Sequence, residues 1–572
     1  MIRPLASATA SLETGPGFSS GPKDVKFDCL DKPRWRSVAE GAVHIWVRGY
    51  LEGNVAETLC QRLAMPGTNA LGETASLLAG ARGHFALIAV APGCAVAAVD
   101  WVRSIPLFFA ECGGEWRIDD QADRLRKSVR IADDAVDPDA ALAIAMAGYT
   151  IDRATLYRGL CMLGPGECAA FRQGAAPAIQ RYYAYRPWRV NAARSDDALG
   201  RELEELTLDV VRRMIESLGG RMLAIPLSAG FDSRLIASAA RHLGHKNVRC
   251  FAYGRAGNFE AAASREIAER LGYAWHFVPY TIAGQRRFFS SSPHAAYLDY
   301  ADSCASVPFE QDMPALAALK ASGFIPADAV IANGNSGDYI SGMHIPPALR
   351  IVPKGLEAEG RKRRILSALS YKHFALWNHL QSPTNIGRIE ALLWRSIEQA
   401  GGALGAPEAD HGLYEYAEFQ DRQCKYVITG QRVYEFLGHD WRLPLWDNEY
   451  LRFWESIPLQ HKVGQGLYAR MLTAANWGGV WRGVRINAKT IRPRWVVPLR
   501  WIAKAAHAPL GRDRWHSFER RYLQYWIDVT CSSAVVPYRV AARDRRGARH
   551  AVAWLGDRYL KGKGIDVDRF AV

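Results

Sequence analysis

The chain has 572 residues, and its 72 Lys and Arg residues against 58 Asp and Glu give a formal net charge of +14. This length exceeds what one hydrophobic core holds, so we expect two to four domains. The ten cysteines are scattered, without a Cys-x-x-Cys pair or a Cys/His cluster, which argues against a disulfide framework and a structural zinc site. The longest apolar stretch, residues 85–99, is interrupted by a Pro-Gly pair, and no signal peptide is recognisable. We therefore expect a cytoplasmic protein.

The N-terminal part begins with a stretch rich in Gly, Ser and Pro at residues 14–22, which predicts a flexible leader within residues 1–35. Apolar runs at residues 43–47 and 85–90 predict strands of a first domain over residues 36–190. An amphipathic pattern at residues 196–218 predicts the opening helix of a second domain, which spans residues 191–480.

The next segment has the pattern of a phosphate-binding loop. An apolar run leads into the small-residue sequence Ser-Ala-Gly-Phe-Asp-Ser at residues 228–233, and a helix pattern follows. Backbone N–H groups at such a turn, with the positive end of the helix dipole behind them, bind phosphate. Ser228 and Ser233 can donate hydroxyl hydrogen bonds, and Asp232 offers the oxygen ligands that Mg²⁺ prefers.

Strands and helices alternate after this loop. Strand patterns at residues 248–253 and 275–280 flank a helix pattern at residues 259–271, which predicts a parallel α/β unit. Ligands of such sheets bind at the carboxyl ends of the strands, where the Ser228 loop lies. A helix-rich region is expected from about residue 354 to residue 481. His276 and His344 are isolated in the sequence, so we expect structural or surface roles for them.

In this context the Ser228 loop resembles the pyrophosphate loop Ser-Gly-Gly-x-Asp-Ser of the asparagine synthetase family. Two later segments are similar to further motifs of that family, in the family's order: Asn-Gly-Asn-Ser-Gly-Asp at residues 333–338 and Arg-Leu-Pro-Leu-Trp-Asp-Asn-Glu at residues 442–449. The resemblance implies a parallel α/β pyrophosphate-loop domain of the adenine nucleotide α-hydrolase type, which uses ATP and Mg²⁺. Asp232 and Asp338 would hold the metal. The residues implied to contact the nucleotide are Leu227, Ser228, Gly230, Asp232, Ser233, Tyr253, Asn333 and Gly334.

Residues 83–90 and 99–109 look like the glutaminase-type domain of the same enzymes, which implies an α+β sandwich related to N-terminal-nucleophile hydrolases. That domain normally begins with a cysteine after the initiator methionine, because the thiolate attacks glutamine. Ile2 occupies that place here, and Cys29 is the first cysteine. No processing site that would expose Cys29 is legible, although removal of the leader stays open. We expect a retained domain without glutaminase activity.

The sequence also departs from the family pattern. Ala229 replaces the second loop glycine, Asn335 replaces a glutamate that supports adenylate formation, and Tyr339 replaces another acid. Residues 464–472 resemble the region of the family's catalytic lysine but contain no lysine, so Arg470 is expected to supply the cation. Arginine cannot be deprotonated, so it can stabilise phosphate charge without replacing lysine in every role.

The resemblance implies an ATP-dependent carbon–nitrogen ligase that activates an acceptor carboxylate as an acyl adenylate, with AMP and pyrophosphate as products. The motif variants are similar to a branch associated with bacterial surface polysaccharides, which points to a hexuronic acid as acceptor. Two alternatives stay open: synthesis of asparagine from aspartate, and a nucleotide-binding pseudoenzyme that serves as a scaffold. Without its own glutaminase nucleophile, the protein would need free ammonia, a substrate amine or a partner glutaminase.

The C-terminal extension, residues 481–572, contains 20 Lys and Arg against 7 Asp and Glu, and so carries nearly all of the net charge. Tryptophans interleave with arginines at residues 492–501 and 512–515. This composition is compatible with a solvated basic helical extension, or with contact to an anionic glycan or to the inner face of an acidic membrane. No nucleic-acid module is recognisable, so no specific nucleic acid is expected.

Overall fold

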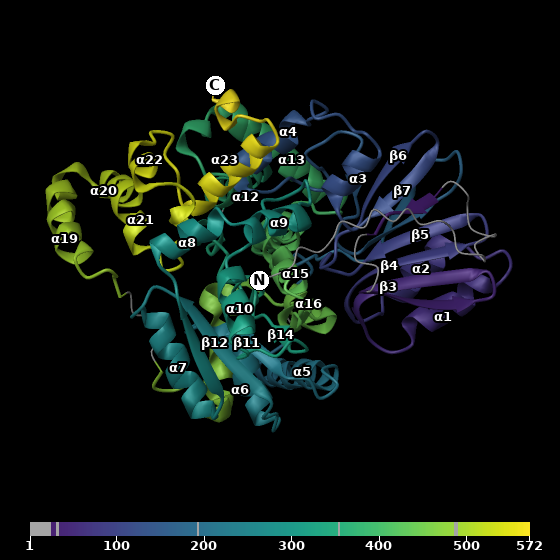
Figure 1. Ribbon diagram of the computed structural model, residues 1–572, viewed down its shortest axis with the longest axis horizontal. Coiled ribbons are helices and arrows are strands. Elements are labelled where there is room, and N and C mark those ends of the chain that lie inside the picture. Colours follow the sequence, from purple (N-terminus) through teal and green to yellow (C-terminus); the bar gives the residue numbers. More distant parts are fainter. Residues whose placement is uncertain (1–24, 30–33, 191–193, 353–354, 485–489, 572) are drawn as a thin grey trace.

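The computed structural model describes residues 25–29, 34–190, 194–352, 355–484 and 490–571. Most of the predicted leader, including Ile2, lies outside these residues. The first part of the chain forms two sheets that pack face to face (Figure 1). The larger sheet has the order β10-β9-β5-β4-β3-β2, with antiparallel neighbours: β2 (Trp35–Glu40), β3 (Val43–Leu51), β4 (Gly83–Ala91), β5 (Cys94–Val99), β9 (Glu167–Phe171) and β10 (Ala178–Arg181). The smaller sheet has the order β1-β7-β6-β8: β1 (Val25–Phe27), β6 (Phe108–Cys112), β7 (Glu115–Asp119) and β8 (Cys161–Met162).

The side chains of β4 show why these strands form a sandwich. Leu87 and Ala89 join the core beneath α1 (Val55–Ala64) and α2 (Ala70–Leu78), whereas Ala86 and Ile88 face the smaller sheet. Because alternate residues of a strand point to opposite faces, a strand that is apolar throughout is buried on both sides. Helix α3 (Ala122–Ser128) packs against β6 and β7 on the far side. The predicted α+β sandwich is confirmed.

The second part of the chain is built on a five-stranded parallel sheet with the order β13-β12-β11-β14-β15. Its strands are β11 (Leu223–Pro226), β12 (Val248–Gly254), β13 (Ala274–Pro279), β14 (Val330–Ala332) and β15 (Asp440–Arg442). The strand order reverses between β11 and β14, and such a switch point opens a crevice at the carboxyl ends of the strands. The predicted parallel α/β domain is therefore confirmed.

Three helices match the sequence patterns closely: α5 (Asp196–Glu216), α6 (Phe231–His242) and α7 (Phe259–Leu271). Helix α7 ends at Gly272, whose φ of 71° is the left-handed conformation that glycine adopts at a helix C-terminus. Between β13 and β14 lie α8 (Ile282–Phe289), α9 (Ser292–Ala301) and α10 (Met313–Ala321).

The predicted helix-rich region is also present. The helices before β15 are α11 (Gly337–Ile340), α12 (Ala358–His373), α13 (Pro383–Gln399), α14 (Asp410–Ala417) and α15 (Arg432–Phe436), with a π-helical segment at Glu418–Val427 that continues α14. The helices after β15 are α16 (Asn448–Glu455), α17 (Leu459–Lys462) and α18 (Gly466–Ala475). No helix in the described ranges combines the length and the apolar character needed to cross a bilayer.

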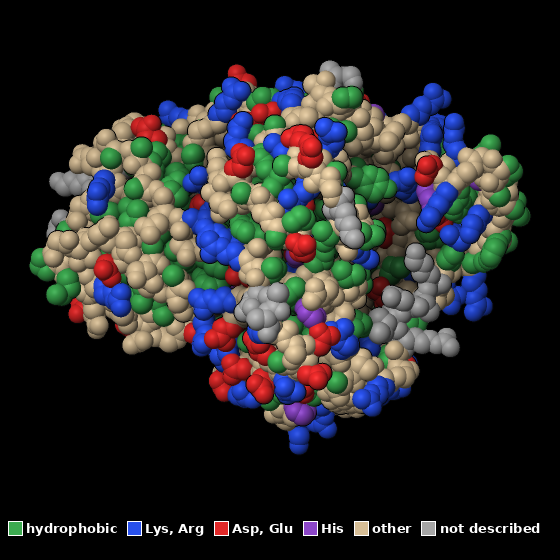
Figure 2. Space-filling view, turned by 180° about the vertical axis from the view of Figure 1, so that it is seen from behind, with side chains coloured by type: hydrophobic (Ala, Val, Ile, Leu, Met, Phe, Trp, Pro, Cys, Tyr) green, Lys and Arg blue, Asp and Glu red, His purple; other side chains and the backbone are tan. Residues whose placement is uncertain are grey.

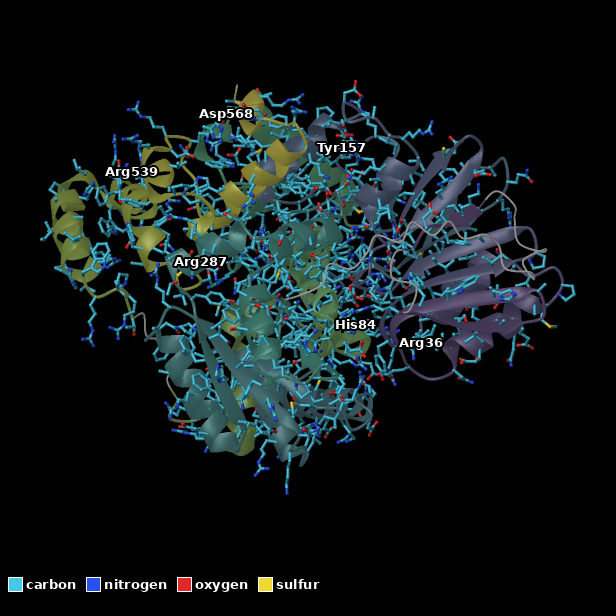
Figure 3. All side chains as sticks on the ribbon, in the orientation of Figure 1. Arg36, His84, Tyr157, Arg287, Arg539 and Asp568 are labelled. Carbon is cyan, nitrogen blue, oxygen red and sulfur yellow. The ribbon has the colours of Figure 1, made fainter. Side chains whose placement is uncertain are left out.

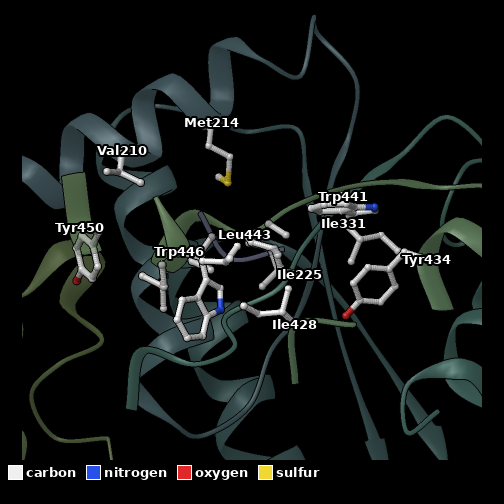
Figure 4. Packing of buried hydrophobic residues seen from close by; sticks show 14 of the residues in the cluster. Val210, Met214, Ile225, Ile331, Ile428, Tyr434, Trp441, Leu443, Trp446 and Tyr450 are labelled. Atoms are coloured by element: carbon white, nitrogen blue, oxygen red, sulfur yellow. The ribbon is translucent and has the colours of Figure 1, made fainter. Parts of the chain in front are cut away.

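A continuous core joins the parallel sheet to its surroundings (Figure 4). Ile225 of β11 and Ile331 of β14 pack with Leu443 and Trp446, which follow β15. The Trp446 ring also stacks on Tyr339 at a centroid distance of 5.9 Å. Close packing of this kind leaves little room for movement, so it holds the loops after β11 and β14 in fixed positions.

Polar contacts join the sandwich to the parallel-sheet part. His84 of β4 lies at the junction (Figure 3), with its ring 6.0 Å from that of Trp441 in β15. The Asn448 amide donates a hydrogen bond of 2.6 Å to the carbonyl oxygen of Ala81. The sandwich is therefore packed against the rest of the molecule.

The C-terminal segment divides into two differently placed halves. Its helices are α19 (Val496–His507), α20 (Arg512–Phe518), α21 (Gln524–Ile527), α22 (Tyr538–Arg543) and α23 (Ala551–Gly562). Helix α23 packs against α4 (Pro138–Ala147) of the sandwich part, and Leu560, Val567 and Phe570 are buried there. This half is core, so a solvated extension does not describe it. Helices α19 and α20 lie at the left margin of Figure 1, whereas α23 lies near the top.

Candidate active site

The Ser228 loop connects β11 to α6 at the switch point of the parallel sheet. The Ser233 hydroxyl oxygen accepts a 3.0 Å hydrogen bond from the Ser228 N–H and lies 3.2 Å from the Ser228 hydroxyl. The Gly230 N–H donates to the Ser228 hydroxyl oxygen at 3.1 Å. No side chain caps the N-terminus of α6. The first turn of this helix therefore keeps backbone donors that suit an anion.

Ala229, which replaces a glycine of the family pattern, fits the loop without strain. Its side chain is buried, and it is absent from the seven non-glycine residues with positive φ in the described part of the chain. Only a positive φ would penalise alanine relative to glycine here. This substitution therefore does not distort the loop.

The second predicted loop, after β14, lies directly against the first. A Cβ atom on Gly334 would come within 2.6 Å of the Ser233 nitrogen, and one on Gly337 within 2.5 Å of a carboxylate oxygen of Asp232. The Asp338 N–H donates a 2.9 Å hydrogen bond to the other Asp232 oxygen. The two acids that the sequence placed 106 positions apart are thus neighbours.

The pKa values of Asp232 and Asp338 show that too little positive charge lies near them for both carboxyls to ionise easily. Burial and the nearby charge of Asp338 raise the pKa of Asp232 to about 8. Burial works in the same direction on Asp338, but the hydrogen bond and charge of His344 outweigh it and lower the pKa of that carboxyl. The Tyr468 hydroxyl donates to Asp232 at 3.3 Å. A bound cation would remove the penalty on ionised Asp232.

The pair suits Mg²⁺ shared with a phosphate. This ion is commonly held by one or two carboxylates together with substrate phosphates, and hard oxygen ligands of this kind are present here. Within the described ranges, three donors come within reach of a single ion only at Asp123, Asp302 and Cys304. That cluster already contains the Lys563 ammonium group, which pairs with both of its carboxylates. Asp232 and Asp338 therefore remain the better candidates.

Asn333 and Tyr253, two more of the predicted nucleotide contacts, belong to one hydrogen-bonded network. The Asn333 amide donates to the Tyr434 hydroxyl at 2.6 Å, and Tyr434 donates to Asp312 at 2.7 Å. Tyr253, at the end of β12, also donates to Asp312, and its ring stacks on Tyr280. Leu227 is buried, and its N–H donates to a β12 carbonyl.

Residues 202–297 match the sequence model of the asparagine synthase family. This part of the chain is similar to asparagine synthase domains. A probable asparagine synthetase (glutamine-hydrolyzing) of Acanthamoeba polyphaga mimivirus is 35% identical over 88 residues, which cover 15% of this chain and 16% of that protein. Among solved structures, glutamine phosphoribosylpyrophosphate amidotransferase from B. subtilis, complexed with ADP and GMP, aligns with 44% of this chain and 74% of its own at 11% identity and a TM-score of 0.18.

The match to the asparagine synthase family contains the Ser228 loop and Tyr253 but stops before the second loop. The hydrogen bond between Asp338 and Asp232 is what joins the second loop to the matched region. The aligned relative is covered over only a small part of its length, so the activity of the whole chain is a matter for proposal.

His344, for which the sequence indicates a structural or surface role, lies beside the acids. Its Nε2 lies 3.2 Å from an Asp338 carboxylate oxygen, and its Nδ1 contacts Glu418. Burial alone would lower the pKa of His344, but the carboxylates of Glu418 and Asp338 raise it to about 9. The protonated imidazole thus bridges two acids. Sequence spacing could not show this, because Glu418 is 74 positions away.

Basic side chains lie around Glu418, near Asp338. Glu418 is fully buried and is held by His373 at 3.0 Å, while Arg422 and Lys372 lie at 3.4 and 3.7 Å. The side chains of Lys372 and Arg422 each keep 30% of their surface exposed, and that of Asp338 keeps 47%. Two partly exposed cations therefore lie near Asp338.

The structure does not bring Arg470 to this cluster. Its guanidinium forms an ion pair of 2.9 Å with Asp196 at the start of α5, and more than half of its side chain is exposed. Tyr468 of the same helix reaches Asp232 instead. A buried lysine was missed: Lys462, at the end of α17, lies 3.1 Å from Glu415 and packs against Gly342. It lies just outside the segment in which the sequence resemblance places a lysine.

The sandwich offers no activated thiol at Cys29. Burial, followed by the charges of Asp120 and Asp119, raises the pKa of this thiol well above its ordinary value. Arg48 and Arg124 act in the opposite direction but do not outweigh these effects. Because the thiolate is the nucleophile, this environment suits a structural cysteine.

Proposed function

We propose that this protein is an ATP-dependent amide-forming ligase that activates an acceptor carboxylate as an acyl adenylate. The observation that carries the proposal is the convergence of Asp232 and Asp338 beside the uncapped N-terminus of α6, at the switch point of the parallel sheet. A structural loop has no need for two adjacent acids, one of which is costly to ionise.

In the proposed reaction, an acceptor carboxylate oxygen attacks the α-phosphorus of ATP, and pyrophosphate departs. An amine then attacks the acyl carbon and displaces AMP. The N–H groups of the Ser228 loop and the hydroxyls of Ser228 and Ser233 would hold the departing pyrophosphate. Asp232 and Asp338 would hold Mg²⁺, which when bound neutralises charge on the phosphates. His344 would keep the Asp338 carboxylate oriented through its hydrogen bond.

Two partly exposed cations near Asp338 support a carboxylate acceptor. Lys372 and Arg422 each keep 30% of their side-chain surface exposed, so both can attract an anionic substrate. We propose a hexuronic acid of surface-polysaccharide synthesis as acceptor, since Asn335 replaces the glutamate of the asparagine-forming pattern. Asparagine synthesis from aspartate is the competing function, favoured by the name of the matched relative.

The nitrogen source is proposed to be ammonia, a substrate amine or the product of a partner glutaminase. The support is the environment of Cys29, where burial and two carboxylates oppose the thiolate that glutamine hydrolysis requires.

Pyrophosphate release from ATP and Mg²⁺ tests the function, with aspartate and a panel of uronic acids as acceptors and ammonium or glutamine as nitrogen source. Asp232→Ala serves as the blank, and Asp197→Ala, an exposed acid at the start of α5, as the matched control. We expect release with a uronic acid and ammonium. Release with aspartate would favour asparagine synthesis, whereas ATP binding without release for any acceptor would favour the scaffold.

A further inference from the structure

Helix α19 exposes an apolar face to solvent. Five large apolar side chains on and beside this helix keep about half or more of their surface accessible: Trp495 (50%), Leu499 (49%), Trp501 (66%), Ile502 (68%) and Leu510 (62%). Trp495, Leu499 and Ile502 follow the spacing i, i+4, i+7 and so share one side of the helix. Single exposed apolar residues are ordinary, but a cluster of this size marks an interaction surface.

An adjacent side of α19 is already occupied. Val496 is buried in a small core with Trp515 of α20 and Leu523. Arg500 forms an ion pair with Glu519, and the His507 ring lies 4.5 Å from that of Phe518. The lobe of residues 490–527 therefore has its own small core, which fixes which side of α19 points outward.

Basic residues outnumber acidic residues around this face. The sequence has no Asp or Glu between Glu455 and Asp513, whereas Arg492, Arg494, Arg500, Lys504 and Arg512 lie in or beside α19. Figure 2 shows hydrophobic side chains along the outer rim of the lobe on the right, together with Lys and Arg. The face thus combines tryptophans, aliphatic side chains and basic groups.

We propose that the outer face of α19 docks on the surface of an anionic lipid bilayer, with the helix lying parallel to the membrane plane. Such a helix buries its apolar side at the level of the acyl chains and headgroups, tryptophan favours that interface, and nearby basic groups attract anionic lipids. A second copy of the chain fits poorly, because a symmetric contact would place the same basic groups opposite one another. A nucleic acid backbone would leave Leu499, Ile502 and Leu510 without an apolar partner.

Docking would keep the rest of the protein beside the membrane. The lobe projects at one margin of the molecule, while the later helix α23 of the same C-terminal segment is buried against α4. The surface is separate from Asp232 and Asp338 and does not depend on the proposed reaction.

Co-sedimentation of the full chain with lipid vesicles tests the proposal. Vesicles of phosphatidylcholine alone are compared with vesicles that contain about one third phosphatidylglycerol, at ~0.1 M and ~1 M salt, where the screening length falls from ~10 to ~3 Å. We expect binding to the anionic vesicles at low salt and loss of most of it at high salt.

Two variants with matched controls locate the surface. Trp501→Gln with Ile502→Gln removes exposed apolar groups and should weaken binding on the order of tenfold or more. Met65→Gln with Ile351→Gln, of similar exposure elsewhere, should not weaken it. Arg494→Gln with Lys504→Gln should weaken binding about fivefold for each basic residue removed. Arg241→Gln with Lys246→Gln, at exposed positions elsewhere, is the control pair.

The same experiments can overturn the proposal. Equal binding by the wild type and both α19 variants would do so, as would the absence of binding to anionic vesicles. A change of oligomeric mass in the Trp501 and Ile502 variant, with vesicle binding unchanged, would assign the face to a second copy. Oligonucleotide binding that depends on these residues, without vesicle binding, would assign it to nucleic acid.

Discussion

Two regions of this molecule each hold a pair of aspartates, one beside a thiol and the other beside the Ser228 loop. The charge of the aspartates is expected to act in opposite ways in the two regions. In the sandwich, Asp119 and Asp120 lie beside Cys29, where their charge adds to burial in suppressing the thiolate. In the parallel-sheet domain, Asp232 and Asp338 lie beside the Ser228 loop, where their charge would favour the proposed metal ion. Residue type alone therefore does not show whether a site is active. What decides the matter is the charge of the group that the reaction needs: carboxylates disfavour a thiolate and favour a metal cation.

The largest effect is expected when the charge of Asp232 is removed. Asp232→Asn keeps the size of the side chain but loses the anion proposed to hold Mg²⁺, so pyrophosphate release should fall on the order of a thousandfold. The control is Asp197→Asn, at an exposed position of α5. Comparable rates for Asp232→Asn and the wild type would contradict a catalytic role, because the aspartate pair would then be structural.

A smaller loss is expected at His344, which touches Asp338 and not the loop itself. His344→Gln keeps a hydrogen-bond donor but loses the charge between Asp338 and Glu418, and residues that orient metal ligands contribute about 10- to 100-fold. The loss should appear as a higher Mg²⁺ requirement for pyrophosphate release. His379→Gln, which removes a partly buried histidine paired with Asp568, is the control and should leave the Mg²⁺ requirement unchanged.

Burial should also control ionisation at His411 in α14, as it does at Cys29. Burial, followed by the charge of Lys462, lowers the pKa of His411 from 6.5 to about 3. Between these two values the unfolded chain binds a proton that the folded chain does not, so stability falls as the pH falls, by up to about 1.4 kcal/mol per pH unit.

His411→Asn, which can keep the hydrogen bond to the Glu408 carbonyl, should flatten this dependence in urea unfolding between pH 6.5 and 4. At pH 8 the free energy of unfolding of the variant should differ from that of the wild type by much less than about 1.4 kcal/mol. An unchanged slope below pH 6.5 would show that other groups control the acid sensitivity.

The smallest effect is expected at Cys29. Cys29→Ser should leave ammonium-dependent pyrophosphate release unchanged, because the thiol is kept protonated and has no part in the proposed reaction. Alkylation by iodoacetamide at neutral pH should likewise be slow at Cys29 relative to the exposed Cys161. Glutamine-dependent activity that Cys29→Ser abolishes would show that Cys29 is not merely structural and that the sandwich has a catalytic role.

Local sequence patterns predicted the helices and strands and the place of the Ser228 loop between β11 and α6. Helix α7 and strands β12 and β13 lie within one residue of their predicted ranges, because apolar periodicity and the glycine after α7 act over a few residues. Asp232 and Asp338 were also predicted, since each lies in a motif close to one strand end. The domain boundaries and the nucleotide contacts stay predictions.

Which distant side chains pair with one another could be seen only in the tertiary structure. His344 and Glu418, Lys462 and Glu415, and Arg470 and Asp196 are pairs whose members lie far apart in the chain. It also divided the basic C-terminal segment into the exposed face of α19 and the buried α23, although both are amphipathic helices. Periodicity predicts that a helix has an apolar side, but what that side meets depends on segments elsewhere in the chain, and these come together only when it folds.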